Sequence, residues 1–181
     1  MNKNFLTPEE IKIKLLNKIP DSFIRDRAII ELLYKTGLRV KELINIRKDD
    51  IDLNNHNQIT PINITGKHER TIFINNETFN LIKKMLEKRK KESDFLFITR
   101  TGKQLNRVDV ENIIKKYRIN DNITANTLKQ SYINFMLNNA NFTVEEVKKL
   151  VGQEYLSIKK TIDNVDSDDL KNKYKQIIWP V

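Results

Sequence analysis

Apolar side chains recur every three to four residues through most of the chain, and this spacing is typical of one buried face of an α-helix. The predicted helices span residues 7–18, 25–35, 39–46, 77–91, 107–117, 126–137, 143–150 and 170–174. Thr7 and Thr143 each precede an acidic first turn, which is a signal for a capped helix start. The pattern therefore predicts a mainly helical protein.

The pattern changes to strict alternation in one region. Residues 59–65 place Ile62 and Ile64 on one face, and residues 71–74 do the same with Ile72 and Ile74. The polar turn between them contains glycine and predicts a β-hairpin with Lys67 at its tip. Residues 95–97 form a further short apolar run and are predicted to be a strand. We therefore expect a single α+β domain over residues 1–181, mainly helical with a small antiparallel sheet.

Residues 36–43 predict a sharp corner between two helices. Gly37 can adopt the left-handed backbone conformation that ends a helix. Arg39 then opens the next helix, with Glu42 and Leu43 following at helical spacing. An arginine beside the free N–H groups of a helix start is a phosphate-binding arrangement. An ordinary helix corner with a solvated arginine is the alternative interpretation of this stretch.

Composition narrows the functional classes. The 33 basic residues outnumber the 24 acidic ones and give a net charge of +9, which favours a polyanionic partner such as nucleic acid. A basic protein without such a partner is the alternative, and the many lysines and asparagines could reflect an A·T-rich genome. The absence of cysteine excludes disulfides, thiolate metal sites and cysteine nucleophiles.

The sequence predicts neither a metal nor a cofactor. His56 and His68 have no second ligand at metal-binding spacing. No apolar run reaches signal-peptide length or the roughly 20 residues of a membrane span, so no membrane partner is expected. We therefore expect an intracellular, cytoplasmic protein.

The corner at residues 36–43 resembles the first conserved box of the tyrosine recombinases, the phage integrase family, which reads T-G-L/M-R-x-x-E-L. The matching residues are Thr36, Gly37, Leu38, Arg39, Glu42 and Leu43. The resemblance implies that Arg39 grips a DNA phosphate. Gly66, Lys67 and Arg70 fit the family's G-K-x-x-K/R turn, whose lysine acts as general acid. In isolation, a lysine in a hairpin turn is more often simply solvated.

Two further boxes are present, but their chemical positions differ from the family pattern. Residues 126–132 stand in place of H-x-L-R-H-S/T-F, with Asn126 for the first histidine and Lys129 for the second arginine. Gln153 replaces the last histidine or tryptophan. The nucleophilic tyrosine is expected nine residues after that position, where this chain has Ile162. Only Arg39 and Lys67 of the six catalytic roles therefore remain.

The resemblance thus implies a tyrosine recombinase-like protein that binds double-stranded DNA without cutting it, as a regulator, repressor or accessory factor of a mobile element or phage. Lysine keeps the charge of an arginine but loses its two-pronged grip. Asparagine and glutamine can bond a phosphate but cannot transfer a proton at neutral pH. The expected DNA-contacting residues are Arg39, Lys67, Arg70, Asn126, Lys129 and Gln153.

Two alternative functions remain open at the level of sequence. One is an active recombinase or integrase with a displaced nucleophile, for which Tyr155 and Tyr174 are the candidates. The other is a protein-interaction module or homo-oligomer that uses the C-terminal helix and residues 171–179. The resemblance covers residues 7–180, which implies a whole catalytic domain without the family's amino-terminal DNA-clamping domain.

Overall fold

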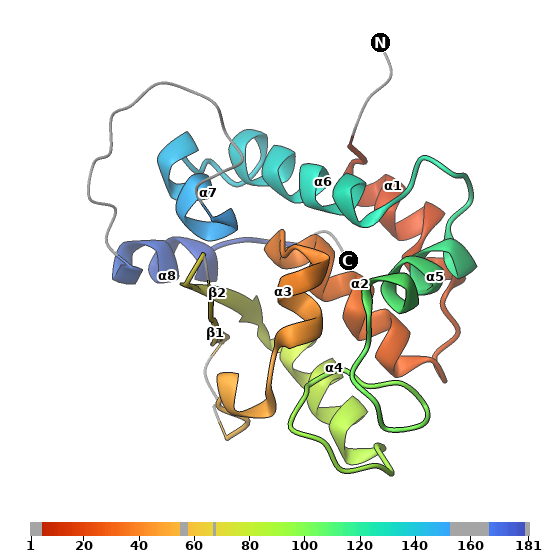
Figure 1. Ribbon diagram of the computed structural model, residues 1–181. Coiled ribbons are helices and arrows are strands. Elements are labelled where there is room, and N and C mark those ends of the chain that lie inside the picture. Colours follow the sequence, from red (N-terminus) through yellow and green to blue (C-terminus); the bar gives the residue numbers. More distant parts are fainter. Residues whose placement is uncertain (1–4, 55–57, 67, 153–166, 180–181) are drawn as a thin grey trace.

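The computed structural model describes residues 5–54, 58–66, 68–152 and 167–179. In these residues, helices surround one two-stranded antiparallel sheet, as the sequence predicted (Figure 1). The helices are α1 (Pro8–Lys14), α2 (Ile24–Thr36), α3 (Val40–Asn45), α4 (Asn76–Glu87), α5 (Arg107–Tyr117), α6 (Ala125–Asn138), α7 (Val144–Val151) and α8 (Ser167–Lys175). The strands are β1 (Ile59–Ile64) and β2 (Arg70–Asn75).

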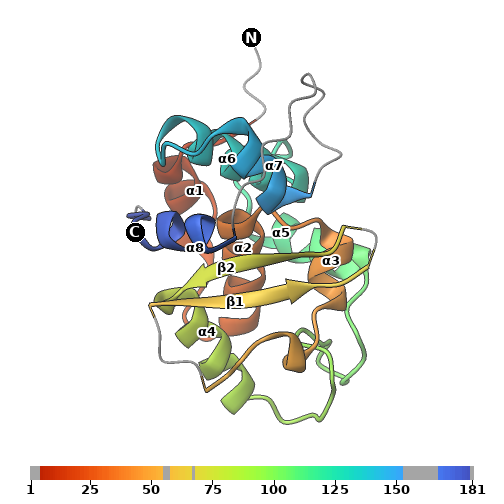
Figure 2. The same ribbon diagram turned by 90° about the vertical axis from the view of Figure 1, so that its left-hand side faces the viewer.

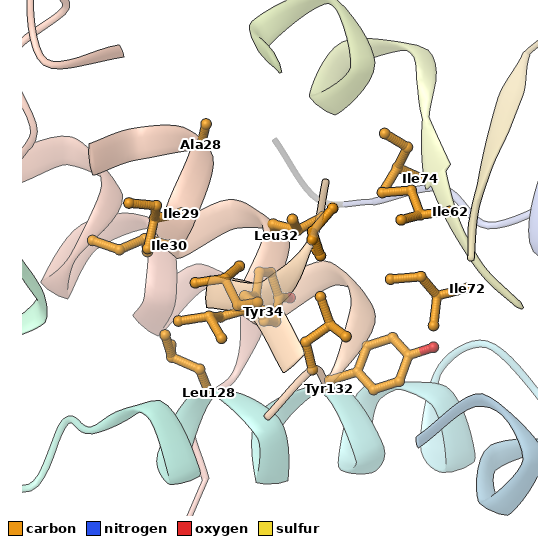
Figure 3. Packing of buried hydrophobic residues seen from close by; sticks show 14 of the residues in the cluster. Ala28, Ile29, Ile30, Leu32, Tyr34, Ile62, Ile72, Ile74, Leu128 and Tyr132 are labelled. Atoms are coloured by element: carbon orange, nitrogen blue, oxygen red, sulfur yellow. The ribbon is translucent and has the colours of Figure 1, made fainter. Parts of the chain in front are cut away.

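Helix α2 lies at the centre of the fold. Its residues 28–36 are all buried, because α4, α6, the sheet and α5 pack around it. Figure 3 shows Leu32 of α2 between the isoleucines of the hairpin and the residues of α6, including Tyr132. The buried ammonium group of Lys35 lies 3.2 Å from Glu31 and 2.9 Å from Glu77, so its charge is neutralised within the core. The surrounding elements are therefore positioned by their contacts with α2.

The predicted hairpin forms, and the isoleucines of each strand share one face as the alternation predicted. Ile62 of β1 pairs with Ile72 of β2, and both side chains face the core together with Ile64 and Ile74. Figure 2 shows the hairpin along one side of the molecule, with α4 below it and α7 above. This packing brings the turn of the hairpin towards the beginning of α3.

The capping signals in the sequence are also confirmed. The hydroxyl of Thr7 accepts a hydrogen bond from the backbone N–H of Glu10, and Thr143 does the same for Glu146. In both cases the glutamate returns a bond to the backbone of the threonine. These reciprocal bonds satisfy N–H groups that a helix start would otherwise leave without partners.

The structure corrects two predicted elements. Helix α4 ends at Glu87, four residues earlier than predicted, because the Arg89 guanidinium turns back to donate to the carbonyls of Ser93, Phe95 and Leu96. Residues 95–97 are not a strand of the sheet. Phe95 makes only an isolated bridge with Arg47, and burial in the core accounts for the apolar character of this segment.

The C-terminal segment packs against the body of its own chain. The hydroxyl of Tyr174 in α8 donates to the carbonyl of Lys35, over a distance of 2.8 Å, at the end of α2. Trp179 stacks on Phe135 and Tyr132 of α6, with ring centroids 4.8 Å and 6.3 Å away. Leu170, Tyr174 and Trp179 are all buried. None of the described helices has the length and apolar character needed to span a membrane.

Candidate functional site

The corner between α2 and α3 requires glycine at position 37. Its φ of 65° is left-handed, and a Cβ atom there would lie 2.5 Å from the ring of Tyr132. The Gly37 N–H donates to the carbonyl of Leu33, and the next side chain, Leu38, is buried. The chain then leaves the core at Arg39, which is the N-cap residue of α3 and has 28% of its side-chain surface exposed.

Glu42 is the anionic centre around which this corner is arranged. Its carboxylate accepts the backbone N–H of Arg39 at 2.8 Å and lies 3.5 Å from the Arg39 guanidinium. It also accepts two hydrogen bonds from Arg70, at 2.7 Å and 3.0 Å. Burial by itself would raise the pKa of Glu42, but the hydrogen bonds and charges of Arg70 and Arg39 outweigh it and lower this pKa. The carboxylate therefore stays ionised between two guanidinium groups.

Arg70 points into the protein. Only 6% of its side chain is exposed, and besides its two bonds to Glu42 it donates to the carbonyls of Leu150 and His68. These contacts join β2 to α3 and to the C-terminal turn of α7, where a cation is favoured by the helix dipole. The DNA contact that the sequence predicts for Arg70 stays a prediction. In the structure its guanidinium lies where it positions Glu42 and, through it, Arg39.

Lys129 reaches the same corner from α6. The side chain is buried, at 4% exposure, and three of its charged neighbours are Arg39, Glu42 and Arg70. Burial and the positive charges of Arg39 and Arg70 lower the pKa of Lys129, the charge of Glu42 opposes them, and the net result is a pKa of about 8. The start of α3, strand β2 and helix α6 thus bring three cations to the Glu42 carboxylate, namely those of Arg39, Arg70 and Lys129. We call these four residues the phosphate cluster.

The remaining predicted site residues lie at the border of this cluster or outside the described residues. Asn126 is exposed in the first turn of α6, one turn before Lys129. Lys67, Gln153 and Ile162 lie outside the described residues. Arg39 and Lys129 lie close enough for their charges to interact, whereas the positions of Lys67, Gln153 and Ile162, and the binding role of all these residues, stay predictions.

A cleft of about 430 Å³ opens beside the phosphate cluster, between α3 and the hairpin. Arg39 and Glu42 form part of its wall. Sequence reasoning missed the other polar residues that line it, which are Lys41, Asn45, Asp50, Asn63, Thr65 and His68. Two signals could have identified some of them: Lys41 and Asn45 are four residues apart on α3, and Asn63 is the outward-facing residue between two buried isoleucines. The cleft lining itself is balanced, with Arg39 and Lys41 against Glu42 and Asp50, so the excess of positive charge that suits an anion such as a phosphate lies in the adjoining cluster.

The described tyrosines are not placed to attack such an anion. Tyr34, Tyr132 and Tyr174 are buried, and burial raises the pKa of each hydroxyl, so each stays protonated at neutral pH. Tyr117 donates its hydroxyl proton to the Asp26 carboxylate, over 2.8 Å. Tyr155 lies outside the described residues. The cluster therefore supports anion binding, and none of the described tyrosines is placed to act as a nucleophile.

Comparison with known proteins identifies the family of this chain. The sequence profile of the phage integrase family matches residues 4–162, so the chain belongs to that family. It is 31% identical over 166 residues to tyrosine recombinase XerD of Staphylococcus haemolyticus, covering 84% of this chain and 54% of that protein. It is 33% identical over 171 residues to tyrosine recombinase XerA of Pyrococcus furiosus, covering 92% of this chain and 59% of that protein.

Solved structures show the same fold. A crystal structure of XerA recombinase matches with a TM-score of 0.71 at 21% identity, over 96% of this chain and 60% of that one. The Tn1549 transposon integrase in complex with circular intermediate DNA matches with a TM-score of 0.69 at 18% identity, over 99% of this chain and 65% of that one. The chain spans little more than half the length of XerD and about three fifths of both XerA proteins.

Proposed function

We propose that this protein binds double-stranded DNA by holding a backbone phosphate at the phosphate cluster, and that it does not cut the DNA. The observation that carries the proposal is the approach of Arg39 and buried Lys129 to the same carboxylate, beside an open cleft. Relatives of this fold include recombinases and an integrase solved in complex with DNA. A contact of this kind is electrostatic, so binding should weaken steeply as salt increases.

This chain lacks residues that the family needs to cleave DNA. A tyrosine hydroxyl attacks the DNA phosphate in family members, and Ile162, which stands at the corresponding position, has no atom that can do so. Lys129, Asn126 and Gln153 replace groups that stabilise charge or move protons. Loss of a single preorganised charge stabiliser already lowers rates by on the order of 10²–10³. Several such losses together with the missing nucleophile leave binding as the retained activity.

An active enzyme with a displaced nucleophile is the competing function. Tyr174 is a poor candidate, because its hydroxyl is buried and bonded to the carbonyl of Lys35. Tyr155 lies two residues after Gln153 instead of nine. Seven residues of helix correspond to a displacement of roughly 10 Å, which is far beyond the tolerance of an attacking atom.

The biological role that follows is regulation. A protein that occupies recombinase-type DNA without cutting it would act as a repressor or an accessory factor of a mobile element or phage. The support for this role is analogy with the family, since a fold by itself does not fix a function. The net charge of +9 agrees with a DNA partner, because it favours association with a polyanion.

The other partner that we propose is a second copy of this chain, bound through the C-terminal helix. Tyr174 and Trp179 already occupy sites on their own chain, so a dimer would form by exchange of this segment between two copies. Such an exchange repeats the same contacts between chains and needs no further apolar surface. Light scattering over a range of concentrations tests it, and a monomer at all concentrations would contradict it.

The DNA proposal is tested by gel shift and fluorescence anisotropy on several unrelated duplexes. Arg39→Ala should weaken binding about equally on all of them, because a phosphate contact carries no base information. Lys115→Ala, which removes an exposed lysine on α5, is the matched control and should have little effect. Unchanged binding by Arg39→Ala would show that the cluster is not the DNA site.

Cleavage is tested with a nicked suicide duplex followed by denaturing gels. We expect no covalent protein–DNA adduct. An adduct that disappears in Tyr155→Phe or Tyr174→Phe would overturn the proposal and favour a recombinase with a displaced nucleophile.

A further inference from the structure

A second cleft, of about 480 Å³, lies at the opposite end of α2 from the phosphate cluster. The start of α2, the end of α4 and the loop after it form this cleft, which we call the basic groove. Thirteen residues of helix separate the two ends of α2, which corresponds to roughly 20 Å. The basic groove is therefore a separate site, and a ligand there would not compete directly with one at the phosphate cluster.

The walls of the basic groove are held in place by arginine–carbonyl hydrogen bonds. Arg25 donates to the carbonyl of Ile98 at 3.0 Å, and its other nitrogens bond the Asp26 carboxylate. Arg89 donates to the carbonyls of Phe95 and Leu96 from the opposite wall. These contacts fix the loop against both helices, so the groove exists before any ligand binds. A preformed groove avoids part of the ordering cost of binding.

The surface of the basic groove combines an apolar lining with a cationic rim. Met85, Leu96 and Ile98 lie in its lining, and Phe23 stands at its edge with 42% of its surface exposed. The rim carries several lysines and arginines, and the exposed ones are Lys88, Lys90, Lys91 and Arg100. The acidic residue in the lining is Asp26, whose buried carboxylate is already bonded by Arg25 and Tyr117. The rim therefore presents net positive charge.

We propose that the basic groove binds an acidic peptide segment of a partner protein that carries one large apolar side chain. The apolar side chain would enter the groove beside Phe23, and the flanking carboxylates would pair with Lys88, Lys90 and Lys91. Charge complementarity selects the acidic segment, and the apolar lining favours a protein ligand over nucleic acid. A sugar–phosphate backbone would pair with the lysines but would leave the exposed ring of Phe23 in contact with water.

The hydrogen bonds that build the groove also explain why α4 is short. If α4 continued to residue 91, as the sequence predicted, Arg89 could not turn back to the loop carbonyls. The early end of the helix places Lys90 and Lys91 on the rim, and the side chain of Lys91 lies beneath Gly102 of the following turn. The basic residues at positions 88–91 therefore line the groove and are more than a solvated run after the helix.

The test uses fluorescence anisotropy with a labelled synthetic peptide that has several glutamates around a central tryptophan. Two control peptides separate the two parts of the proposal: one has glutamine for every glutamate, and the other has alanine for the tryptophan. We expect both control peptides to bind more weakly by at least about tenfold. Equal binding of all three peptides would overturn the proposal.

Protein variants then locate the binding site. Lys90→Glu/Lys91→Glu should weaken binding of the acidic peptide by at least about tenfold. Lys83→Glu/Lys84→Glu is the matched control, since both lysines are exposed on α4 outside the groove and the change in net charge is the same. Phe23→Ser should weaken the tryptophan peptide but not the alanine peptide. Thermal unfolding of each variant verifies that it is folded.

The outcome is independent of the proposed DNA function. Arg39→Ala should bind the peptide as well as the parent protein does, whatever its effect on DNA. If duplex DNA displaces the peptide and the Lys90→Glu/Lys91→Glu variant loses DNA as strongly as peptide, the groove is a nucleic-acid contact and the proposal fails. Equal peptide affinity of the Lys90→Glu/Lys91→Glu variant and the parent protein would also overturn the proposal.

Discussion

The two ends of α2 hold basic side chains in opposite ways. At the C-terminal end, Arg70 and Lys129 are buried, and the Glu42 carboxylate lies among their charges. At the N-terminal end, Lys88, Lys90 and Lys91 are exposed around an apolar groove. A buried cation depends on its partners for both position and charge state, whereas an exposed lysine is held only weakly by its neighbours. The first arrangement gives a fixed geometry, and the second gives an adaptable surface.

Arg70→Met is the most severe test of the buried arrangement around Glu42. The substitution leaves the Glu42 carboxylate without its two-pronged partner, and loss of one member of a buried pair lowers the free energy of unfolding by about 3–5 kcal/mol. The matched control is Arg107→Met, which removes an exposed partner of Glu111 and should cost less than about 1 kcal/mol. Urea denaturation measures both. Equal losses would show that Arg70 is not an internal positioning group.

Gly37→Ala tests how tightly the corner is built. Alanine would have to adopt the left-handed conformation and place its Cβ against Tyr132, which together should lower stability by about 2–4 kcal/mol. Gly66→Ala is the control, because its φ is 101° but no atom lies within 4 Å of the added Cβ. Gly66→Ala introduces backbone strain without a steric contact, so a larger loss in Gly37→Ala would report the contact with Tyr132. A loss in Gly37→Ala below about 1 kcal/mol in thermal unfolding would contradict a tightly packed corner.

The smallest expected effect is a pH dependence of DNA binding. Because the pKa of Lys129 is lowered to about 8, this group changes from mostly charged to mostly neutral between pH 7 and pH 9. Binding of a phosphate favours the charged form, so affinity should fall as pH rises, by up to about tenfold at pH 9. The effect should be absent in Lys129→Arg, whose side chain stays protonated. A parent protein with the same affinity at both pH values would contradict a role for Lys129 in phosphate binding.

The same lowered pKa has the opposite consequence for folding. Between pH 8 and the usual lysine pKa of about 10.4, the unfolded chain binds more protons at this position than the folded chain. The contribution of Lys129 to stability therefore rises with pH over that interval, and its full penalty is present below pH 8. DNA affinity and stability should thus respond to pH in opposite directions through one side chain.

The fold was largely predictable because its signals are local. Helical periodicity, alternation in the hairpin and the threonine caps each depend on residues within a few positions of one another. The phosphate cluster was predictable only in part: the family boxes identified Arg39 and Lys129, but the inward direction of Arg70 depends on Glu42, 28 residues earlier in the chain. The basic groove was not predicted, because the end of α4 is determined by carbonyl groups of a loop that comes later in the sequence.

Trp179 is the single tryptophan of the chain, and it lies stacked on Phe135 and Tyr132. Tyr132 is also the residue that confines Gly37 at the corner before Arg39. The intrinsic fluorescence of the protein is therefore a spectroscopic reporter of whether the C-terminal segment is docked. An undocked segment would expose the indole to water and shift its emission to longer wavelength. The behaviour of this segment can thus be followed in real time, without a label, while DNA is added.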